Sequence, residues 1–580
     1  MLRRKIMSAL LLCAIMLPTT AFVQAQSKIY QAPKATIDRI KEEGTKNSKV
    51  METLSYLTDV IGARLTASPN MKRANEWTRD TMAQWGMQNA HLEAWGPFGR
   101  GWELKRFSAQ VSAPYSFPLI AYPKAWSPGI SIMPPPPPAN PKNKKNAPMP
   151  TAAPSTVLTA EVVYLDASTE AELEKYKGQL KGKIVLMSGE REVKADFDGY
   201  SERLTDKQLL EMANAPDPNS VQRPTGQPNN DQMQARLKRF MDGMKRSKFV
   251  IDEGAAIVVD NSFNGTGGTI FVQQASVAAD IPANPLDFFT QPRLQPWDKE
   301  GEAKMVPQVT VATEDYNRMV RMIKAGEKVQ MTVDLAVQYH DEDLMSYNTI
   351  AEIPGSDLKD EVVMLGGHMD SWHSGTGATD NAAGVAVAME AARIIMASGL
   401  KPRRTIRVAL WSGEEQGLHG SSNYVKQHLG EMKGGGNIFG IPQANAAKPE
   451  LIKGADYDKL SAYYNLDNGT GKIRGVYMQG NSAVAPIFRA WLAPFGEMGA
   501  STLTMQNTGG TDHLSFDRIG LPGFQFIQDE IEYDTRTHHS NQDVFDRIQA
   551  DDMKQAATIM AAFVYQTAMM DEKMPRKEMR

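Results

Sequence analysis

Cysteine is nearly absent from this sequence: Cys13 is the only one among 580 residues. It lies in an N-terminal segment that we expect to be removed, so the mature chain would have neither a disulfide nor a thiolate metal ligand. Any metal site must then be built from nitrogen and oxygen donors. Stability must come from packing, and a chain of this length with 42% hydrophobic residues can bury a large core in more than one domain.

A strong charge of either sign is also missing, and so are long apolar runs. The net charge is −3, and no basic run is long enough to follow a nucleic-acid backbone, which argues against a nucleic-acid partner. Beyond residue 25, no apolar stretch is long enough to span a bilayer, so we expect no membrane span in the mature chain.

The first 25 residues have the order of features that is typical of an export signal. Three positive residues at 3–5 are followed by an apolar run at 7–17 and by small residues around Ala25. The alternative is a buried N-terminal helix, but the order of charge, apolar run and small residues favours export. We therefore predict a signal peptide over 1–25 and a periplasmic or secreted mature protein.

Proline, asparagine and lysine dominate residues 131–156, which predicts an exposed, extended loop. It is typical of a surface linker, with a ligand for a proline-reading module as the alternative. Short β-branched runs at 161–165, 183–187 and 255–259 then indicate a small mixed domain over 129–338, inserted into a larger one. This insertion has no cluster of His, Asp and Glu with ligand spacing, so we assign it no chemistry.

From residue 339 the pattern alternates between strands and helices. Four apolar runs predict strands, and the first is continuous enough to be buried on both faces: 362–365, 405–410, 462–466 and 523–527. Residues 382–397 predict a helix with one apolar face. The alternation implies the α/β class, with a mainly parallel sheet flanked by helices. Residues 26–128 and 339–580 would form one domain around the insertion.

Five residues with metal-binding side chains lie in order along this half of the chain, and four of them fall just past predicted strands. They are His368, Asp380, Glu415, Asp467 and His539. Sites in such sheets form beyond the carboxyl ends of the strands. Two imidazoles and three carboxylates can hold two divalent cations if one carboxylate bridges them, and the adjacent Glu414 is then left to activate a water.

Each of these residues also has an ordinary explanation. Asp380 begins the predicted helix and could be its N-cap, the Glu414–Glu415 pair could be solvated, and Asp467 could simply start a loop. Asp370, two residues after His368, could cap a turn or could fix the tautomer of that imidazole with its carboxylate. The combination of side chains at four strand ends favours the metal site.

These motifs resemble those of the co-catalytic zinc exopeptidases, a family that includes aminopeptidases and glutamate carboxypeptidases. The resemblance covers most of the mature chain and is greatest to the carboxypeptidase Q-like branch, whose N-terminal segment is similar to 56–86. Residues 180–189 and 252–260 resemble a protease-associated domain. The matching metal motifs are GHMD (367–370), TDN (379–381), the Glu414–Glu415 pair, LDN (466–468) and HSNQD (539–543).

The resemblance implies a role for each candidate. The ligands of two zinc ions would be His368, Asp380 and Asp467 for one and Asp380, Glu415 and His539 for the other. Asp380 would thus bridge the ions, Glu414 would be the general base, and Asp370 would support His368. Zinc is the first expectation, with cobalt or manganese as substitutes.

Two further histidines fall in segments that match the family. His538 stands where some members have a tyrosine that donates to the oxyanion, so it would either donate from an imidazole N–H or lie exposed beside the site. His513, within 509–516, would contact substrate or have a structural role.

The sequence therefore predicts an exported dinuclear zinc exopeptidase that hydrolyses dipeptides or short peptides, as an aminopeptidase or as a carboxypeptidase or dipeptidase. A catalytically inactive, receptor-like binding protein is one alternative, and a glutaminyl cyclase-like acyltransferase is another. Retention of every ligand and of Glu414 argues against the first, and the inserted domain argues against the second. A homodimer is left open. We expect the insertion to form one wall of the substrate cleft and to limit peptide length.

Overall fold

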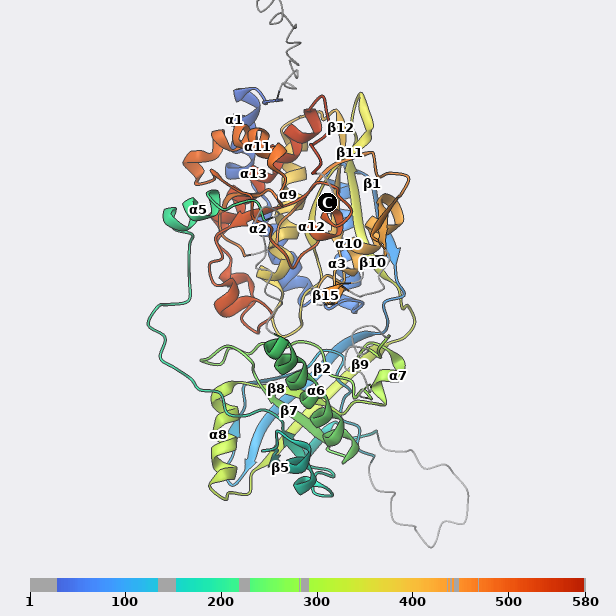
Figure 1. Cartoon of the computed structure of the whole chain (residues 1–580), viewed down its shortest axis with the longest axis vertical. Helices are drawn as coiled ribbons and strands as arrows, with labels where there is room; N and C mark the ends of the chain where they lie inside the picture. The colour runs from blue at the N-terminus through green and yellow to red at the C-terminus, as the bar shows by residue number, and fades with distance from the viewer. Residues whose placement is uncertain are drawn as a thin grey trace, which may run out of the picture.

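The structure is a computed structural model that describes residues 29–133, 153–218, 230–280, 282, 292–434, 437–438, 441–442, 448–467 and 469–577. The expected signal peptide and most of the proline-rich loop lie outside these residues. The described chain forms two lobes, each built around an eight-stranded sheet (Figure 1). No helix in this part of the chain is long and apolar enough to cross a membrane.

The first lobe contains a sheet with the strand order β1-β10-β12-β11-β17-β20-β18-β19. Its four central strands run parallel to one another: β12 (Arg404–Trp411), β11 (Leu358–His368), β17 (Leu460–Asn465) and β20 (Gly523–Gln528). The outer strands include antiparallel pairs: β1 (Gln88–Trp95), β10 (Ser346–Ile353), β18 (Ile473–Tyr477) and β19 (Thr502–Thr504). The predicted α/β class is confirmed, and the parallel pairing is concentrated at the centre of the sheet.

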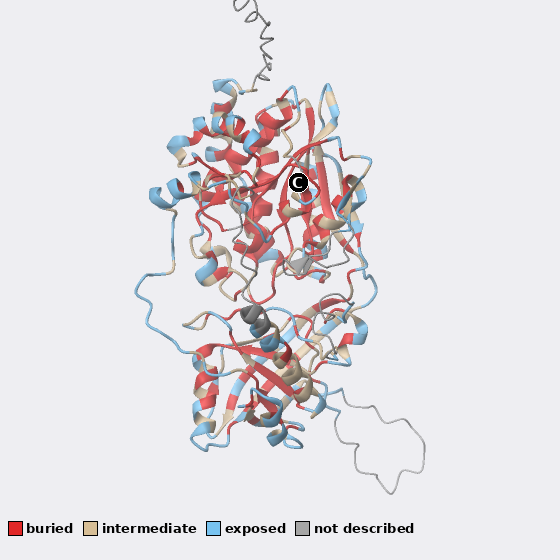
Figure 2. Ribbon diagram, viewed as in Figure 1, coloured by how far each residue is buried: buried red, intermediate tan, exposed pale blue. Residues whose placement is uncertain are grey.

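Helices cover both faces of this sheet, which explains the continuous apolar run of β11. Val363 and Leu365 belong to one buried cluster, whereas Met364, between them, belongs to the cluster on the other face. Figure 2 shows buried residues running through the helices and strands of this lobe. Its helices are α1 (Lys34–Lys46), α2 (Val50–Ser55), α3 (Pro69–Gln84), α9 (Ala383–Ala397), α10 (His419–Tyr424), α11 (Ala485–Leu492), α12 (His513–Asp517) and α13 (Ala550–Met569).

Helix α9 differs in one respect from the expected amphipathic helix. We predicted a single apolar face, but α9 is buried almost all round, because it packs against α13, α2 and β11 at once. Even Glu390 is buried there, and Arg393 compensates its charge at 2.7 Å.

The second lobe contains a sheet with the order β3-β2-β9-β5-β6-β7-β8-β4, in which β5, β6, β7 and β8 are parallel. The strands are β2 (Gly101–Ala113), β3 (Phe117–Pro118), β4 (Ala121–Pro123), β5 (Val157–Tyr164), β6 (Ile184–Leu186), β7 (Ile257–Asn261), β8 (Gln308–Val311) and β9 (Gln330–His340). The helices of this region of the sequence are α4 (Glu170–Leu173), α5 (Asp206–Ala213), α6 (Asn230–Asp252), α7 (Lys299–Glu302) and α8 (Thr313–Lys324).

The boundary between the lobes differs from the one we expected at residue 128. Strand β2 pairs with β9 from Gly101 to Ala113, so residues 101–123 belong to the second sheet and not to the first. The chain crosses between lobes at 95–101 and again at 340–346. Strands β4 and β5 lie on either side of the proline-rich stretch that suggested the boundary, and both belong to the second lobe, so the stretch does not mark the junction of the lobes.

One segment of the second lobe's sequence returns to the first lobe. Helix α5 packs on β19, and Figure 1 shows α5 beside the helices of the first lobe. Just before it, Arg203 forms ion pairs with Asp529 at 2.9 Å and Asp552 at 2.8 Å, both of which are buried. The two lobes are therefore joined by the packing and ion pairs of this segment as well as by the crossings at 95–101 and 340–346.

A buried histidine at the junction of the lobes predicts a pH-dependent stability. His373, after β11, donates from Nε2 to the carbonyl of Pro123 at 2.7 Å and packs edge-on against Trp102. Burial lowers its pKa to about 4, well below the usual value for histidine. Below pH 6.5 the unfolded chain therefore binds a proton at this histidine that the folded chain does not bind. The contribution of neutral His373 to the free energy of unfolding is complete above pH 6.5 and is lost as the pH falls towards 4.

Between pH 7 and pH 5 the His373 side chain should reduce the free energy of unfolding by about 2 kcal/mol. Urea unfolding of wild type and of His373→Phe at both pH values measures this contribution as the difference between their pH dependences. Equal dependences in the two proteins would show that His373 is protonated in the folded state.

Candidate metal centre

The candidate ligands meet at the carboxyl edge of the first lobe's sheet. His368 ends β11, Glu415 follows β12 and Asp467 follows β17, so three of them come from adjacent parallel strands. Asp380 lies in the turn before α9, and His539 lies in the loop beyond β20. This is the edge where sites form in such sheets, because neighbouring parallel strands end side by side there.

The distances divide the five side chains into two groups that share Asp380. His368 Nε2 lies 3.2 Å from Asp380 Oδ1 and 3.4 Å from Asp467 Oδ1. On the other side, His539 Nε2 lies 3.2 Å from Asp380 Oδ2 and 2.9 Å from Glu415 Oε2. Asp380 thus presents one carboxylate oxygen to each group, which is the arrangement of a bridging ligand.

The hydrogen bonding of these atoms fits a metal site. Within the described residues, several buried atoms that face one another have no hydrogen-bond partner: His368 Nε2, Asp380 Oδ2, Glu415 Oε1 and Asp467 Oδ1. Buried polar atoms are normally satisfied. A cluster of unsatisfied nitrogen and oxygen donors, with no thiolate among them, suits zinc, cobalt or manganese.

The cluster of buried carboxyl groups at the site also favours the binding of cations. Burial, and next the charge of Asp380, raise the pKa of Glu415 to about 7. Burial likewise raises the pKa of Asp543 and that of Asp512 to about 7. So many buried carboxyl groups repel one another when ionised, and divalent cations among them would remove that cost.

Asp380 is not the N-cap of α9, which was the ordinary explanation for it. Asn381 accepts a hydrogen bond from the Gly384 backbone instead, through Oδ1 at 2.9 Å. The backbone N–H of Asp380 donates to Asp543 Oδ2 at 3.2 Å, and that of Thr379 donates to Asp543 Oδ1 at 2.5 Å. Asp543 therefore holds the backbone of Asp380 in place, and both oxygens of Asp380 stay directed towards the other candidate ligands.

Asp370 contacts the site differently from what we expected. The Nδ1 of His368 lies 3.0 Å from the backbone carbonyl of Asp370 but 3.7 Å from its carboxylate. The carbonyl thus fixes the imidazole tautomer. The carboxylate accepts from the backbone N–H groups of Glu414 and Glu415, each at 3.2 Å. It positions the two glutamates, because it lies nearer to their amides than to the imidazole.

Glu414 points towards the site without joining either group. Its Oε2 lies 4.0 Å from His368 Nε2, and its side chain is 9% exposed. Burial raises its pKa well above the ordinary value, although the positive charge of His368 opposes this shift. A buried carboxylate close to the ligands, but beyond their contact distance, can accept and return a proton.

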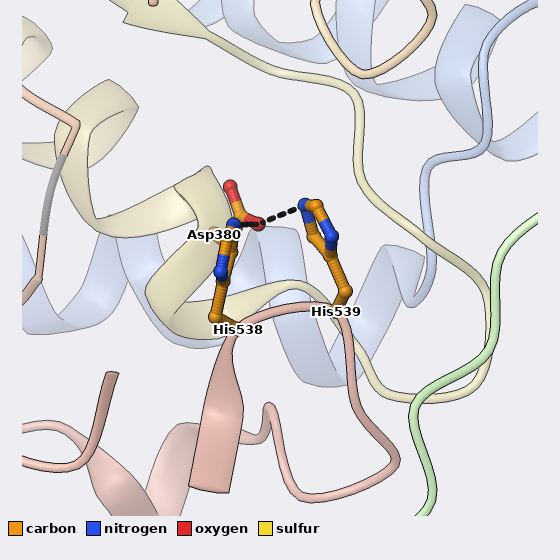
Figure 3. Close-up of side chains that lie close together, drawn as sticks. All are labelled: Asp380, His538 and His539. Carbon is orange, nitrogen blue, oxygen red and sulfur yellow. Dashed lines mark ion pairs between the residues drawn. The ribbon is translucent and has the colours of Figure 1, made fainter. Parts of the chain in front are cut away.

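The two histidines of uncertain role lie in different places. His538 Nε2 lies 3.7 Å from Asp380 Oδ2, and Figure 3 shows His538 and His539 on either side of that carboxylate. The ring of His538 stacks on Tyr533, with centroids 4.6 Å apart. His513 is not brought into the cluster. It is buried beside Gln479 and the Thr508 carbonyl, which supports a structural role.

Sequence reasoning missed Arg64, which is fully buried and donates to the carbonyls of Met369, Thr376 and Gly377 at 2.7 to 2.8 Å. Those carbonyls lie between His368 and Asp380. Burial lowers the pKa of Arg64 to about 10, against the raising effect of Asp543 and Asp370. Arg64 therefore fixes the loop between two ligands and adds a positive charge behind the site. The only sign of its importance in the sequence was its place within 56–86, the segment that resembles the N-terminal segment of the family.

A cavity of about 600 Å³ lies in the second lobe. Gln273 lines it and also lies 3.2 Å from His539 Nδ1. Apolar side chains line much of the rest, among them Phe240, Phe263 and Leu294, which are exposed.

Comparisons with known proteins show which proteins this chain resembles. Residues 348–564 match Peptidase family M28. Carboxypeptidase Q of Mus musculus is 25% identical over 94% of this chain and 91% of its own length. A Peptidase M28 precursor from Shewanella amazonensis SB2B has the same fold, with a TM-score of 0.59 at 21% identity over 94% of this chain and 99% of that chain. BSAP, a zinc aminopeptidase from Bacillus subtilis, has a TM-score of 0.50 at 16% identity, over 90% and 96%.

The fold and the matched relatives define a zinc-dependent metallopeptidase. Within that class, residues 348–564 match Peptidase family M28, and the chain is carboxypeptidase Q-like over nearly its whole length.

Proposed function

We propose that the protein is an exported, dinuclear zinc exopeptidase that hydrolyses dipeptides or short peptides. The observation that carries this proposal is the placement of Asp380, with one oxygen towards His368 and Asp467 and the other towards Glu415 and His539. Zinc ions held by these side chains would polarise the scissile carbonyl and lower the pKa of the attacking water.

The remaining chemistry is that of Glu414. It takes a proton from the attacking water as the oxygen bonds to the carbonyl carbon, and it returns a proton to the amine as the C–N bond breaks. Its pKa, raised by burial, suits a group that must hold and then release a proton. His538, beside the bridging carboxylate, is placed to donate from Nε2 to the developing oxyanion.

We propose that the second lobe forms one wall of the substrate cleft. We infer that residues 101–340 correspond to the inserted protease-associated domain, with the boundary moved to include β2. Its Gln273 reaches the metal centre, and the adjacent cavity offers room for side chains of a short peptide. Export is inferred from the first 25 residues, which precede the described chain.

The proposal is tested with the purified, zinc-loaded protein and three forms of one dipeptide: unblocked, N-acetylated and C-amidated. We expect two zinc ions per chain and release of free amino acids from the unblocked form. Loss of cleavage on acetylation would indicate recognition of the amino end, and loss on amidation would indicate recognition of the carboxyl end. Failure of the loaded protein to cleave any of the three would contradict the proposal.

A further inference from the structure

The second lobe contacts one metal-ligand candidate directly. Residues 268–273, which follow β7, lie against the loop 539–541 of the first lobe. Val272 N donates to the His539 carbonyl at 3.1 Å, and Asn541 N donates to the Ile270 carbonyl at 3.0 Å. Phe271 and Ser540 form an isolated antiparallel bridge between these contacts. The two segments therefore pair like a very short ladder across the lobe boundary.

His539 has a backbone conformation that depends on such support. Its φ is +62°, in the left-handed region that residues other than glycine rarely adopt. Such a conformation persists only where the surroundings fix it. The hydrogen bond from Val272 N to the His539 carbonyl, and the contacts of Asn541 two residues on, supply this constraint from the second lobe.

The side chain of His539 is also held from the second lobe. Its Nε2 faces Asp380 and Glu415, so metal binding through Nε2 requires the proton to be on Nδ1. That N–H needs an acceptor, and the amide nitrogen Nε2 of Gln273 lies 3.2 Å from Nδ1. The oxygen and nitrogen of a glutamine amide exchange places by a half-turn, so Gln273 can present Oε1 to Nδ1–H.

The two imidazoles of the site are thus supported in different ways. His368 is 1% exposed, and its Nδ1 contacts the Asp370 carbonyl in the same lobe. The side chain of His539 is 20% exposed, which makes it the least buried of the five ligand candidates, and its partner comes from the other lobe.

We propose that Gln273 is a positioning residue for His539, and that metal binding at Glu415 and His539 is linked to docking of the second lobe. The inference rests on the proposed role of His539 as a ligand. Linkage is reciprocal, so docking of 268–273 strengthens metal binding at this position, and metal binding holds that segment in place. Metal binding at His368 and Asp467 lacks this dependence.

Stepwise removal of zinc by a competing chelator, with elemental analysis at each step, tests the inference. Gln273→Ala should weaken the binding of one of the two zinc ions by ~10- to 100-fold and leave the affinity for the other unchanged. This is the usual effect of removing a partner of a ligating histidine. Gln273→Glu should restore the affinity, because a carboxylate also accepts from Nδ1–H. Gln274→Ala, at the exposed neighbouring position, should match wild type.

Hydrogen exchange provides a readout independent of turnover. Zinc loading should slow amide exchange in 268–273 of wild type and slow it less in Gln273→Ala. Unchanged zinc affinities in Gln273→Ala, equal weakening of both ions, or no zinc effect on exchange in 268–273 would each overturn the inference. His539→Ala separates the two claims: if it retains both ions at full strength, the ligand assignment itself fails.

Discussion

Replacing Glu414 by glutamine should leave the zinc content unchanged and lower kcat by ~10²- to 10⁴-fold, the usual loss when a general base is removed. Glutamine has nearly the same shape but cannot take a proton from water. The backbone of residue 414 would stay in place, because its N–H donates to Asp370 Oδ1 and that bond does not involve the side chain. Elemental analysis and steady-state kinetics on an unblocked dipeptide measure the two quantities.

The matched control is Glu497→Gln, at an exposed position of the short 3₁₀ helix Ala493–Met498 in the first lobe, which should retain wild-type kinetics. If Glu414→Gln keeps more than a tenth of wild-type activity, Glu414 is not the base. A variant that also loses zinc would instead make Glu414 a ligand, and the roles of the adjacent glutamates would have to be exchanged.

Asp380→Ala should lose both zinc ions together, because its two oxygens face different ligand groups. His539→Ala should weaken the binding of only one zinc ion, since the Nε2 of His539 faces Glu415 and a single oxygen of Asp380. Dialysis against a metal-free buffer followed by elemental analysis distinguishes the two patterns. One zinc ion retained at full strength in Asp380→Ala would exclude the bridge.

Much of the first lobe could be predicted from local sequence patterns. The run 362–365 is apolar at every position because alternate residues enter clusters on opposite faces of the sheet. The predicted strands lie in β11, β12, β17 and β20, apart from a residue at one end of β17. The family assignment is confirmed as well. The extent of the second lobe was not predictable in this way, because β2 pairs with β9 across more than 200 positions.

Some residues of the candidate site could likewise be predicted from the sequence, and others could not. Ligand candidates at strand ends could be found from the sequence, because the end of a buried strand is a local signal. Their roles in binding and catalysis remain predictions. Arg64 and Gln273 could not be found, since their contacts with Met369 and His539 join distant segments and no spacing rule marks them. The support that Asp370 gives to His368 depends on a distance that the sequence does not show: its carbonyl lies 3.0 Å from Nδ1, and its carboxylate lies 3.7 Å away.

The wide separation of the ligands along the chain determines when the protein can take up metal. Among the five candidates and Glu414, only the two glutamates are adjacent, so an unfolded chain contains no compact chelating segment of the kind that lets zinc drive folding in small metal-dependent domains. The metal-free polypeptide must fold on its core alone, around α9 and α13. Zinc then stabilises a fold that already exists. Metal selection is therefore made late, in whichever compartment folding is completed, and the ions available there determine which metal is incorporated.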